Sequence, residues 1–250
     1  MAYTSDKEDK ELYSRADDAL RLSSIRRKPC FLGFLNEREQ YLLTDYISRF
    51  DCCYRFFGGY EGAVRNMLSV SGYEVSDDVF PIDAVYFKYR KSDKLSHRDF
   101  LGALMNLGIE RSSVGDIVVS DGCAVCYVKQ EISDYIRSQI SKIGRVGVKL
   151  ATESECKITF AYDIESLSFI VSSMRLDVIV AAITGLSREK TATLVLSGKV
   201  FVNYTENRNV SHILKEDDIL TIRGNGKFII KEQAGVTKKG RLKLNIEHYR

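Results

Sequence analysis

The 250-residue sequence predicts an α+β fold in three parts, and three patterns of residues support this assignment. Apolar residues recur at helical spacing in the first 75 residues. Residues 80–165 alternate between strand-like and helix-like segments. Residues 172–250 hold two short helical patterns, then short strands and a basic end. We therefore expect a helical N-terminal domain at 1–75, a middle domain at 80–165 and a small α+β module at 172–250.

The N-terminal part shows helical patterns and no catalytic constellation. Residues 9–25 have helical spacing, and Pro29 interrupts them. Residues 36–39 resemble a capping box, with an Asn cap and a Glu three residues later, and predict a second helix. Gly58-Gly59 precedes a predicted short helix at 62–68. This part is expected to serve packing.

The middle part predicts the element order β-α-β-β-α-β. Its segments are a strand at 81–90, a helix at 96–108, strands at 114–119 and 123–128, a helix at 132–143 and a strand at 146–150. This is the ferredoxin-like order, which many RNA-recognition domains share. Such domains stack bases on exposed aromatic residues of the third strand, where only Tyr127 could do so. We therefore expect this domain to position its neighbour. A bridging strand is predicted at 157–162.

Charge is unevenly distributed along the chain. Residues 172–250 carry fourteen Lys and Arg against eight Asp and Glu, a formal charge of +6; the whole chain carries +3, so residues 1–171 carry −3. A concentrated positive field attracts polyanions.

No apolar run approaches the ~20 residues that span a bilayer, and residues 1–10 do not resemble a signal peptide. The sequence predicts a cytoplasmic protein with no membrane partner.

The cysteines give no evidence of a metal site. Cys123 and Cys126 are the one suggestive pair among six, but no second pair or histidine cluster lies near them in sequence. Residues 122–128 also read as a strand, in which these two side chains would face opposite sides. We expect core cysteines, no bound metal and no cofactor.

The last part is predicted to begin with two helices, the first capped by Ser172 or Ser173 and the second by Ser187. The start of the second helix is unusual. A helix N-terminus carries about +0.5 charge, so Arg188 and Lys190 in the first turn are unfavourable by ~0.3–1 kcal/mol each. Free backbone N–H groups together with cations suit a phosphate. A solvated basic face is the alternative interpretation of any single residue.

Several short motifs accompany this helix start. They are Arg175-Leu176-Asp177, Ser187-Arg188, Gly198-Lys199-Val200, Val202-Asn203, Asp218-Ile219 and Arg223-Gly224. The combination resembles the S-four-type RNA-binding domain over most of residues 174–230. Glu189 and Thr191 depart from that pattern. The resemblance implies that the helix start lines an RNA groove. The expected RNA-binding residues are Arg175, Ser187, Arg188, Lys190, Thr191, Lys199, Asn203, Arg223 and Lys227.

The whole chain resembles the YlmH-like family of bacterial proteins. The matching segments are Gly58-Gly59 with Glu61 and Arg65, residues 223–228 and residues 237–240. The resemblance implies a helical N-terminal part, a ferredoxin-like middle and a C-terminal S-four-type domain. It also implies binding to rRNA and tRNA on the large ribosomal subunit that carries peptidyl-tRNA, during rescue of stalled translation.

Two other classes remain open. S-four-type domains also occur in pseudouridine synthases and RNA methyltransferases, but no G-x-G-x-x-G-like loop follows a strand here. Arg175-Leu176-Asp177 superficially resembles a synthase site, yet it falls on a helix of the binding module. The chain could also be a protein-interaction adaptor tethered to RNA. We expect a monomeric, non-catalytic RNA-binding protein. The basic residues 231–250 could form a strand or a disordered extension.

Overall fold

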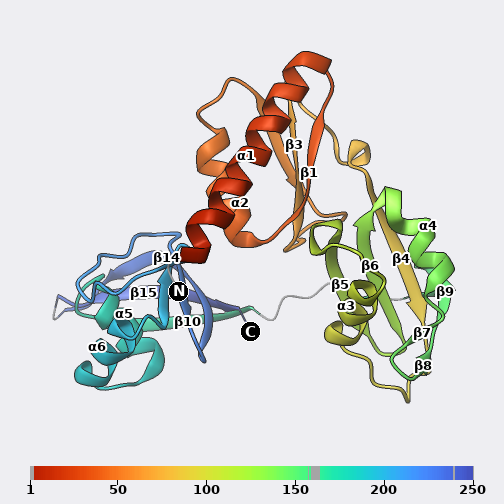
Figure 1. The fold of residues 1–250 in the computed structure, drawn as a ribbon. Helices are drawn as coiled ribbons and strands as arrows, with labels where there is room; N and C mark the ends of the chain where they lie inside the picture. The colour runs from red at the N-terminus through yellow and green to blue at the C-terminus, as the bar shows by residue number, and fades with distance from the viewer. Residues whose placement is uncertain (1–2, 157, 159–163, 239, 250) are drawn as a thin grey trace. The chain divides into compact units, whose positions relative to one another are not determined.

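The chain forms two compact units, Met1–Phe160 and Ala161–Arg250. A computed structural model describes residues 3–156, 158, 164–238 and 240–249 (Figure 1). The first unit contains both the predicted N-terminal and the predicted middle domain, so the boundary between those two stays a prediction. The bridging strand predicted at 157–162 lies outside the described residues, apart from Ile158.

The N-terminal part of the first unit combines two helices with a three-stranded antiparallel sheet of order β1-β3-β2. The elements are α1 (Tyr3–Arg26), β1 (Cys30–Leu35), α2 (Glu37–Ile47), β2 (Cys53–Phe57) and β3 (Asn66–Ser71). The predicted capping box is confirmed: the Asn36 side chain accepts the Glu39 N–H at 3.0 Å, and the Glu39 carboxylate accepts the Asn36 N–H at 2.6 Å. Leu12, Ala16 and Leu43 join the buried core beside the sheet.

The prediction of a helical N-terminal part is wrong, because β1, β2 and β3 form a sheet beside the two helices. The segment expected to form a helix at 62–68 instead leads into β3, the central strand of the sheet. Met67, Leu68 and Val70 are all buried, because this strand is covered on both faces. A short run of apolar residues buried on both faces has no period of two, so periodicity alone does not distinguish it from a helix.

The middle part has the predicted β-α-β-β-α-β order with an added small hairpin. Its elements are β4 (Ile82–Lys88), α3 (His97–Asn106), β5 (Val114–Ser120), β6 (Cys123–Lys129), α4 (Gln130–Gln139), the hairpin β7 (Lys142–Ile143) and β8 (Val146–Gly147), and β9 (Lys149–Ala151). The antiparallel sheet has the strand order β5-β6-β4-β9. Phe87, Phe100 and Ile136 lie in the core between this sheet and the two helices.

The other face of the middle sheet is covered as well. A second buried cluster joins Phe34 of β1 and Met67 of β3 to Val125 and Tyr127 of β6. Tyr127 is 5% exposed. The N-terminal sheet therefore packs against the face of the middle sheet that is opposite its helices.

The second unit is a six-stranded sheet with two helices, and its strand order is β10-β15-β14-β13-β11-β12. Its elements are β10 (Ile164–Val171), α5 (Leu176–Thr184), α6 (Arg188–Leu196), β11 (Val200–Val202), β12 (Thr205–Glu206), β13 (Ile219–Ile222), β14 (Gly226–Val236) and β15 (Leu242–Tyr249). The basic end of the chain is a strand, because β15 pairs with both β14 and β10.

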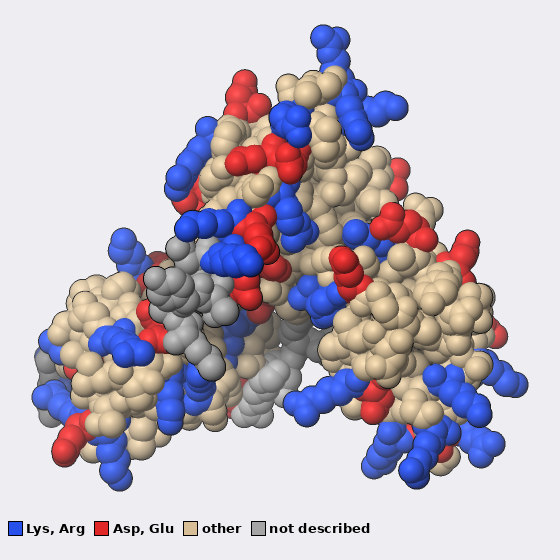
Figure 2. All heavy atoms as spheres, viewed as in Figure 1, with Lys and Arg blue, Asp and Glu red and all other residues tan. Residues whose placement is uncertain are grey.

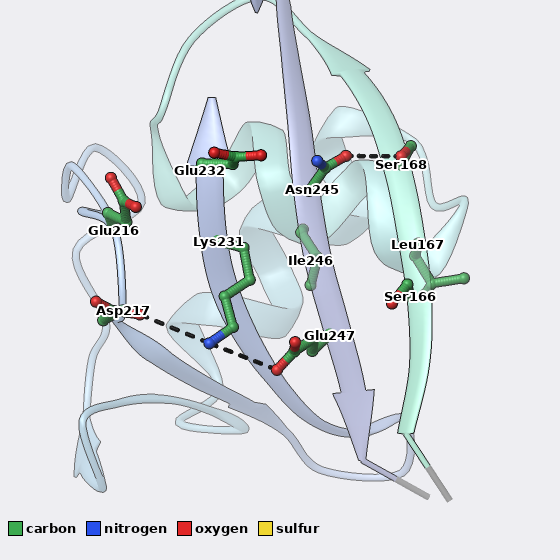
Figure 3. Close-up of a pocket in the computed structure, with 10 residues that line it drawn as sticks. All are labelled: Ser166, Leu167, Ser168, Glu216, Asp217, Lys231, Glu232, Asn245, Ile246 and Glu247. Carbon is green, nitrogen blue, oxygen red and sulfur yellow. Dashed lines mark hydrogen bonds and ion pairs between the residues drawn. The ribbon is translucent and has the colours of Figure 1, made fainter. Parts of the chain in front are cut away.

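The two helices lie on one face of this sheet. Leu176 and Val195 share a buried core with inward side chains of the strands, such as Leu220 and Ile246. In Figure 3 the helices lie behind the strands, on the side away from the labelled residues. We call the face away from the helices the outer face. Within the described part of this unit, no helix covers it.

Candidate nucleic-acid interface

The N-terminus of α6 is exposed and capped. Ser187 has extended backbone dihedrals, and its Oγ accepts the Lys190 N–H at 3.5 Å, which confirms the predicted cap. Arg188, Glu189 and Lys190 are all exposed in the first turn. Gly185, in the left-handed region with φ 67°, ends α5 just before this turn. The cap and the first turn thus present backbone N–H groups and two cations to solvent, the arrangement that favours an anion.

Arg175 is held by an ion pair. It is the N-cap residue of α5, so the predicted caps Ser172 and Ser173 are wrong. The cause is a bridge between Arg175 and Ile213 together with the Leu176 N–H, which donates to His212 O at 2.7 Å and fixes the helix start. The Arg175 guanidinium donates to both Asp177 oxygens, at 3.0 and 2.9 Å.

This ion pair has a clear electrostatic signature. The Arg175 guanidinium holds the pKa of Asp177 below its usual range, and Asp177 raises the pKa of Arg175. The side chain of Arg175 is still 42% exposed, so it can meet solvent while paired. Its charge is partly neutralised, which weakens it as a phosphate ligand.

Thr191, another of the predicted RNA-binding residues, is fully buried in the structure, and its role in binding stays a prediction. It lies one turn before Val195 on the same helix face, and both residues are fully buried. Its Oγ1 has no hydrogen-bond partner among the described residues. The side chains of threonine and valine have similar shapes, so Thr191 fits the core although its hydroxyl makes no hydrogen bond to the described residues.

Asn203 is also engaged inside the protein. Its amide nitrogen donates to Asp218 at 2.8 Å, and its amide oxygen accepts the Ile219 N–H at 2.9 Å. Asp218 in turn accepts the Lys215 N–H at 2.7 Å. Asn203 has φ 49°, a left-handed conformation that Asn tolerates better than most residues. Asn203 thus helps to fix the loop after β11, and its predicted contact with RNA stays a prediction.

The remaining three cations gather at one end of the sheet. The Arg223 N–H donates to Lys199 O at 2.9 Å, which places these two exposed residues opposite each other. The Arg223 guanidinium lies 5.0 Å from the centre of the Phe201 ring. Lys227, on β14, has its ammonium group 4.7 Å from the centre of the Tyr249 ring.

The predicted site thus divides into two surfaces. One is the start of α6, with Ser187, Arg188 and Lys190. The other is the sheet end, with Lys199, Arg223 and Lys227. Nine helical residues span about 13 Å, so α6 separates its own N-terminus from the segment at Lys199. Sequence reasoning treated both as one surface.

Two aromatic residues of the sheet end, Phe201 and Tyr249, were not anticipated. The sequence could have revealed Phe201. In a strand beginning near Lys199, side chains alternate between the two faces, which puts Phe201 on the same face as Lys199. No comparable signal existed for Tyr249, because its neighbours come from a strand pairing that the sequence does not specify.

Tyr127, the one residue of the predicted third strand that could stack on a base, is not available to a base. Its ring stacks on that of Tyr60 at 4.9 Å between centres, inside the cluster that joins the two sheets. Burial raises the pKa of Tyr127. The Tyr60 hydroxyl donates to Asp116 at 2.8 Å, and Asp116 also accepts the Val64 N–H at 2.7 Å. These hydrogen bonds hold the segment at residues 60–64 against the middle sheet.

The middle domain does carry exposed cations at another place. They come from the end of β4 and the loop after it, from the β7–β8 hairpin and from β9. The residues are Lys88, Arg90, Lys91, Lys94, Lys142, Arg145 and Lys149. Lys88 and Lys149 face each other directly across β4 and β9, a like-charge pair that is destabilising by itself. Figure 2 shows lysine and arginine side chains gathered at the lower right, where Figure 1 shows β7 and β8.

The cysteines behave as core residues in the middle sheet. Cys123 and Cys126 are buried, and burial raises the pKa of Cys126 to about 12. Among the residues that the structure describes, no group of His, Cys, Asp and Glu is placed to hold a metal ion. None of the helices in the described ranges is long and apolar enough to cross a bilayer.

Comparisons with known proteins agree on one family. Residues 76–157 match the family model described as "Putative RNA-binding domain in YlmH". The chain is 33% identical over 218 residues to the Bacillus subtilis protein named ribosome-associated protein quality control protein P2, covering 86% of this chain and 85% of that one. It also resembles the solved structure of the cell division protein ylmH from Streptococcus pneumoniae, with a TM-score of 0.51 and 22% identity. That match covers 61% of this chain and 95% of the other.

The structural match shows a shared fold, and the identity to the Bacillus protein over most of both chains shows common descent. The family model adds the middle domain to this evidence. The chain belongs to the YlmH-like family.

Proposed function

We propose that the chain is a non-catalytic RNA-binding protein that acts on the ribosome and recognises structured rRNA and tRNA through an S-four-type module in its second unit. The observation that carries this proposal is the capped, exposed start of α6. There Arg188 and Lys190 add positive charge to a helix end that is already positive. This arrangement gains stability when a phosphate binds. The match of residues 76–157 to a family model for RNA binding supports the same class of ligand.

The biological setting is proposed from the relative. Its name places that protein in ribosome-associated quality control. We propose by analogy that this chain binds the large subunit carrying peptidyl-tRNA, as a cytoplasmic monomer, during rescue of stalled translation. The middle domain would add phosphate contacts through its exposed cations at the ends of β4 and β9. Its sheet face is not proposed as a site, because the N-terminal sheet covers it.

A binding role also accounts for the one motif that resembles an enzyme site. Asp177 lies in the first turn of α5 and accepts two hydrogen bonds from Arg175. It also accepts the Val178 N–H at 3.0 Å. An aspartate held in this way stabilises a helix start, which is a structural task. We therefore favour binding over pseudouridine synthesis.

The test is co-sedimentation with separated ribosomal subunits. The double variant Arg188→Glu/Lys190→Glu should lose binding to the large subunit that the unaltered chain shows. A matched control, Lys215→Glu/Lys243→Glu, makes the same change in net charge at exposed positions of the same unit away from α6. It should retain most of the binding. Equal losses of binding in both variants would show that binding depends only on net charge, which would contradict a specific site at the start of α6.

A further inference from the structure

The outer face of the six-stranded sheet carries a row of side chains at one end. Phe201 lies opposite Thr221, Thr221 opposite Lys227, and Lys227 opposite Tyr249 across four neighbouring strands. Directly opposed residues of an antiparallel sheet share a face. All four are partly exposed, whereas alternate residues of the same strands are buried in the core under the helices.

Cations flank both aromatic rings of this row. Arg223 lies over Phe201, Lys227 lies over Tyr249, and Lys199 is exposed opposite Arg223. We call Lys199, Phe201, Thr221, Arg223, Lys227 and Tyr249 the aromatic–cation row. Rings interleaved with cations on an open sheet are the combination by which proteins bind unpaired nucleic acid, the rings stacking on bases and the cations contacting phosphates.

An acidic cavity borders the row on the same face. Its volume is about 570 Å³, and it is lined by Ser166, Leu167, Ser168, Glu216, Asp217, Lys231, Glu232, Asn245, Ile246 and Glu247 (Figure 3). Glu247 is two residues before Tyr249 on β15, so it points to the same side of the sheet.

The cavity carries four carboxylates against one lysine. Lys231 is already paired with Asp217 at 3.7 Å and with Glu247 at 3.5 Å. A phosphate is therefore repelled from this half of the face. The charge pattern disfavours a polyanion at the cavity and favours the cations of the aromatic–cation row.

We propose that the aromatic–cation row binds unpaired RNA nucleotides, with bases stacked on Phe201 and Tyr249 and phosphates held by Lys199, Arg223 and Lys227. The inference rests on the proposed RNA-binding function and adds a second site of different specificity to it. Three strand spacings separate the two rings, about 14 Å, which corresponds to about four nucleotides of a stacked strand. An exposed cation–π pair is weaker than base stacking, so each cation can leave its ring for a phosphate.

The row is distinct from the α6 site. Arg188 and Lys190 begin a helix that packs on the inner face, whereas Phe201 and Tyr249 lie on the outer face. The first site suits phosphates of a folded RNA. The second needs a base with a free face, which a continuous duplex does not offer. One module would thus bind a structured RNA beside a single-stranded segment.

The absence of tryptophan from the chain permits a direct test. In the full-length protein, Tyr249→Trp introduces a single tryptophan reporter at the row. Adding a short oligouridylate should quench its fluorescence to saturation, whereas a blunt duplex RNA should not. Phe201→Leu in the same background should weaken oligouridylate binding about tenfold, the effect of one lost stacking contact. A control reporter, Tyr135→Trp, lies on α4 in the first unit, where Tyr135 is 48% exposed. It should show no quenching.

The outcomes separate this inference from the proposed function. Quenching that persists in the Tyr249→Trp protein with Arg188→Glu/Lys190→Glu supports an independent row. No quenching by oligouridylate, while the unaltered chain still sediments with large subunits, overturns the row alone. Quenching by polyglutamate but not by oligouridylate also overturns it, because the row would then be a site for acidic protein. Quenching without any ribosome binding retains the row and contradicts the proposed function.

Discussion

The two main sheets of the molecule differ in what lies on the face opposite their helices. The middle sheet is covered by the N-terminal sheet, and Tyr127, its one candidate stacking residue, is 5% exposed. In the described part of the second unit no helix covers the outer face of the sheet, where Phe201 and Tyr249 lie beside cations. A β-α-β-β-α-β order therefore does not establish base stacking. The decisive feature is whether the sheet face remains exposed.

The difference has a simple physical basis. β6 is buried along almost its whole length, and its apolar residues supply both the helix core and the core between the sheets. β13, β14 and β15 largely alternate between buried apolar residues and partly exposed residues of mixed character. A strand with one apolar face leaves its other face for a ligand.

The largest expected effect comes from removing the cover of the middle sheet. Phe34→Ala deletes a ring that is 1% exposed and contacts Gly115, so we expect the first unit to lose about 3–5 kcal/mol of unfolding free energy. Urea unfolding followed by circular dichroism measures this loss. The matched change Phe201→Ala, at a half-buried ring, should cost much less. Equal losses of unfolding free energy in the two variants would show that the rings of Phe34 and Phe201 do not differ in burial.

Charge reversal at α6 should give the next largest effect. Arg188→Glu/Lys190→Glu replaces two attractions to phosphate by two repulsions, and we expect at least a hundredfold loss of RNA affinity, about 2.8 kcal/mol. Neutralising Arg188 alone should lower the slope of log K against log salt concentration by about one. Filter binding at several salt concentrations gives both values. An interaction that is insensitive to salt would exclude phosphate contacts at this helix.

The variant Thr191→Val tests whether Thr191 of α6 contacts RNA or only packs in the hydrophobic core. The variant removes a buried hydroxyl that has no hydrogen-bond partner among the described residues and keeps the side-chain shape, so the second unit should gain about 1 kcal/mol of stability. RNA affinity should not change. Thermal unfolding and filter binding on the same preparation measure the two properties. A loss of affinity at unchanged stability would restore Thr191 as a contact residue.

The smallest effect concerns the Arg175–Asp177 pair. Asp177 has a lowered pKa in the folded chain, so its contribution to stability is present above the pKa of the unfolded state, about 3.9. It is lost as pH falls through the folded value. Asp177→Asn should therefore reduce the acid-dependent part of the stability loss below pH 4. Unfolding curves at pH 6 and pH 3 test this. An unchanged acid dependence in the variant would show that the pair does not contribute.

The sequence predicted local elements well where the chemistry is local. The capping box at Asn36 and the Ser187 cap each depend on residues within one turn. The sequence-based predictions failed where strand pairing and packing between segments determine the structure. β3 is a strand because it pairs with β1 on one side and with β2 on the other. Tyr127 is buried by residues more than fifty positions away, such as Phe34 and Tyr60.

The candidate site shows the same division. Arg188 and Lys190 could be identified because a helix dipole is a local property. The resemblance marks Thr191 and Asn203 but does not reveal that the first is buried and the second is hydrogen-bonded within the protein. Tyr249 was missed because it is brought next to Lys227 only by the pairing of β14 with β15.

Ultraviolet crosslinking of the full chain to bound RNA, followed by mass spectrometry of the crosslinked peptides, tests the central claim most directly. The account predicts crosslinks in the second unit, at Phe201 or Tyr249 and in the first turn of α6, and none at Tyr127. Crosslinks at Tyr127, or crosslinks confined to the first unit, would contradict it.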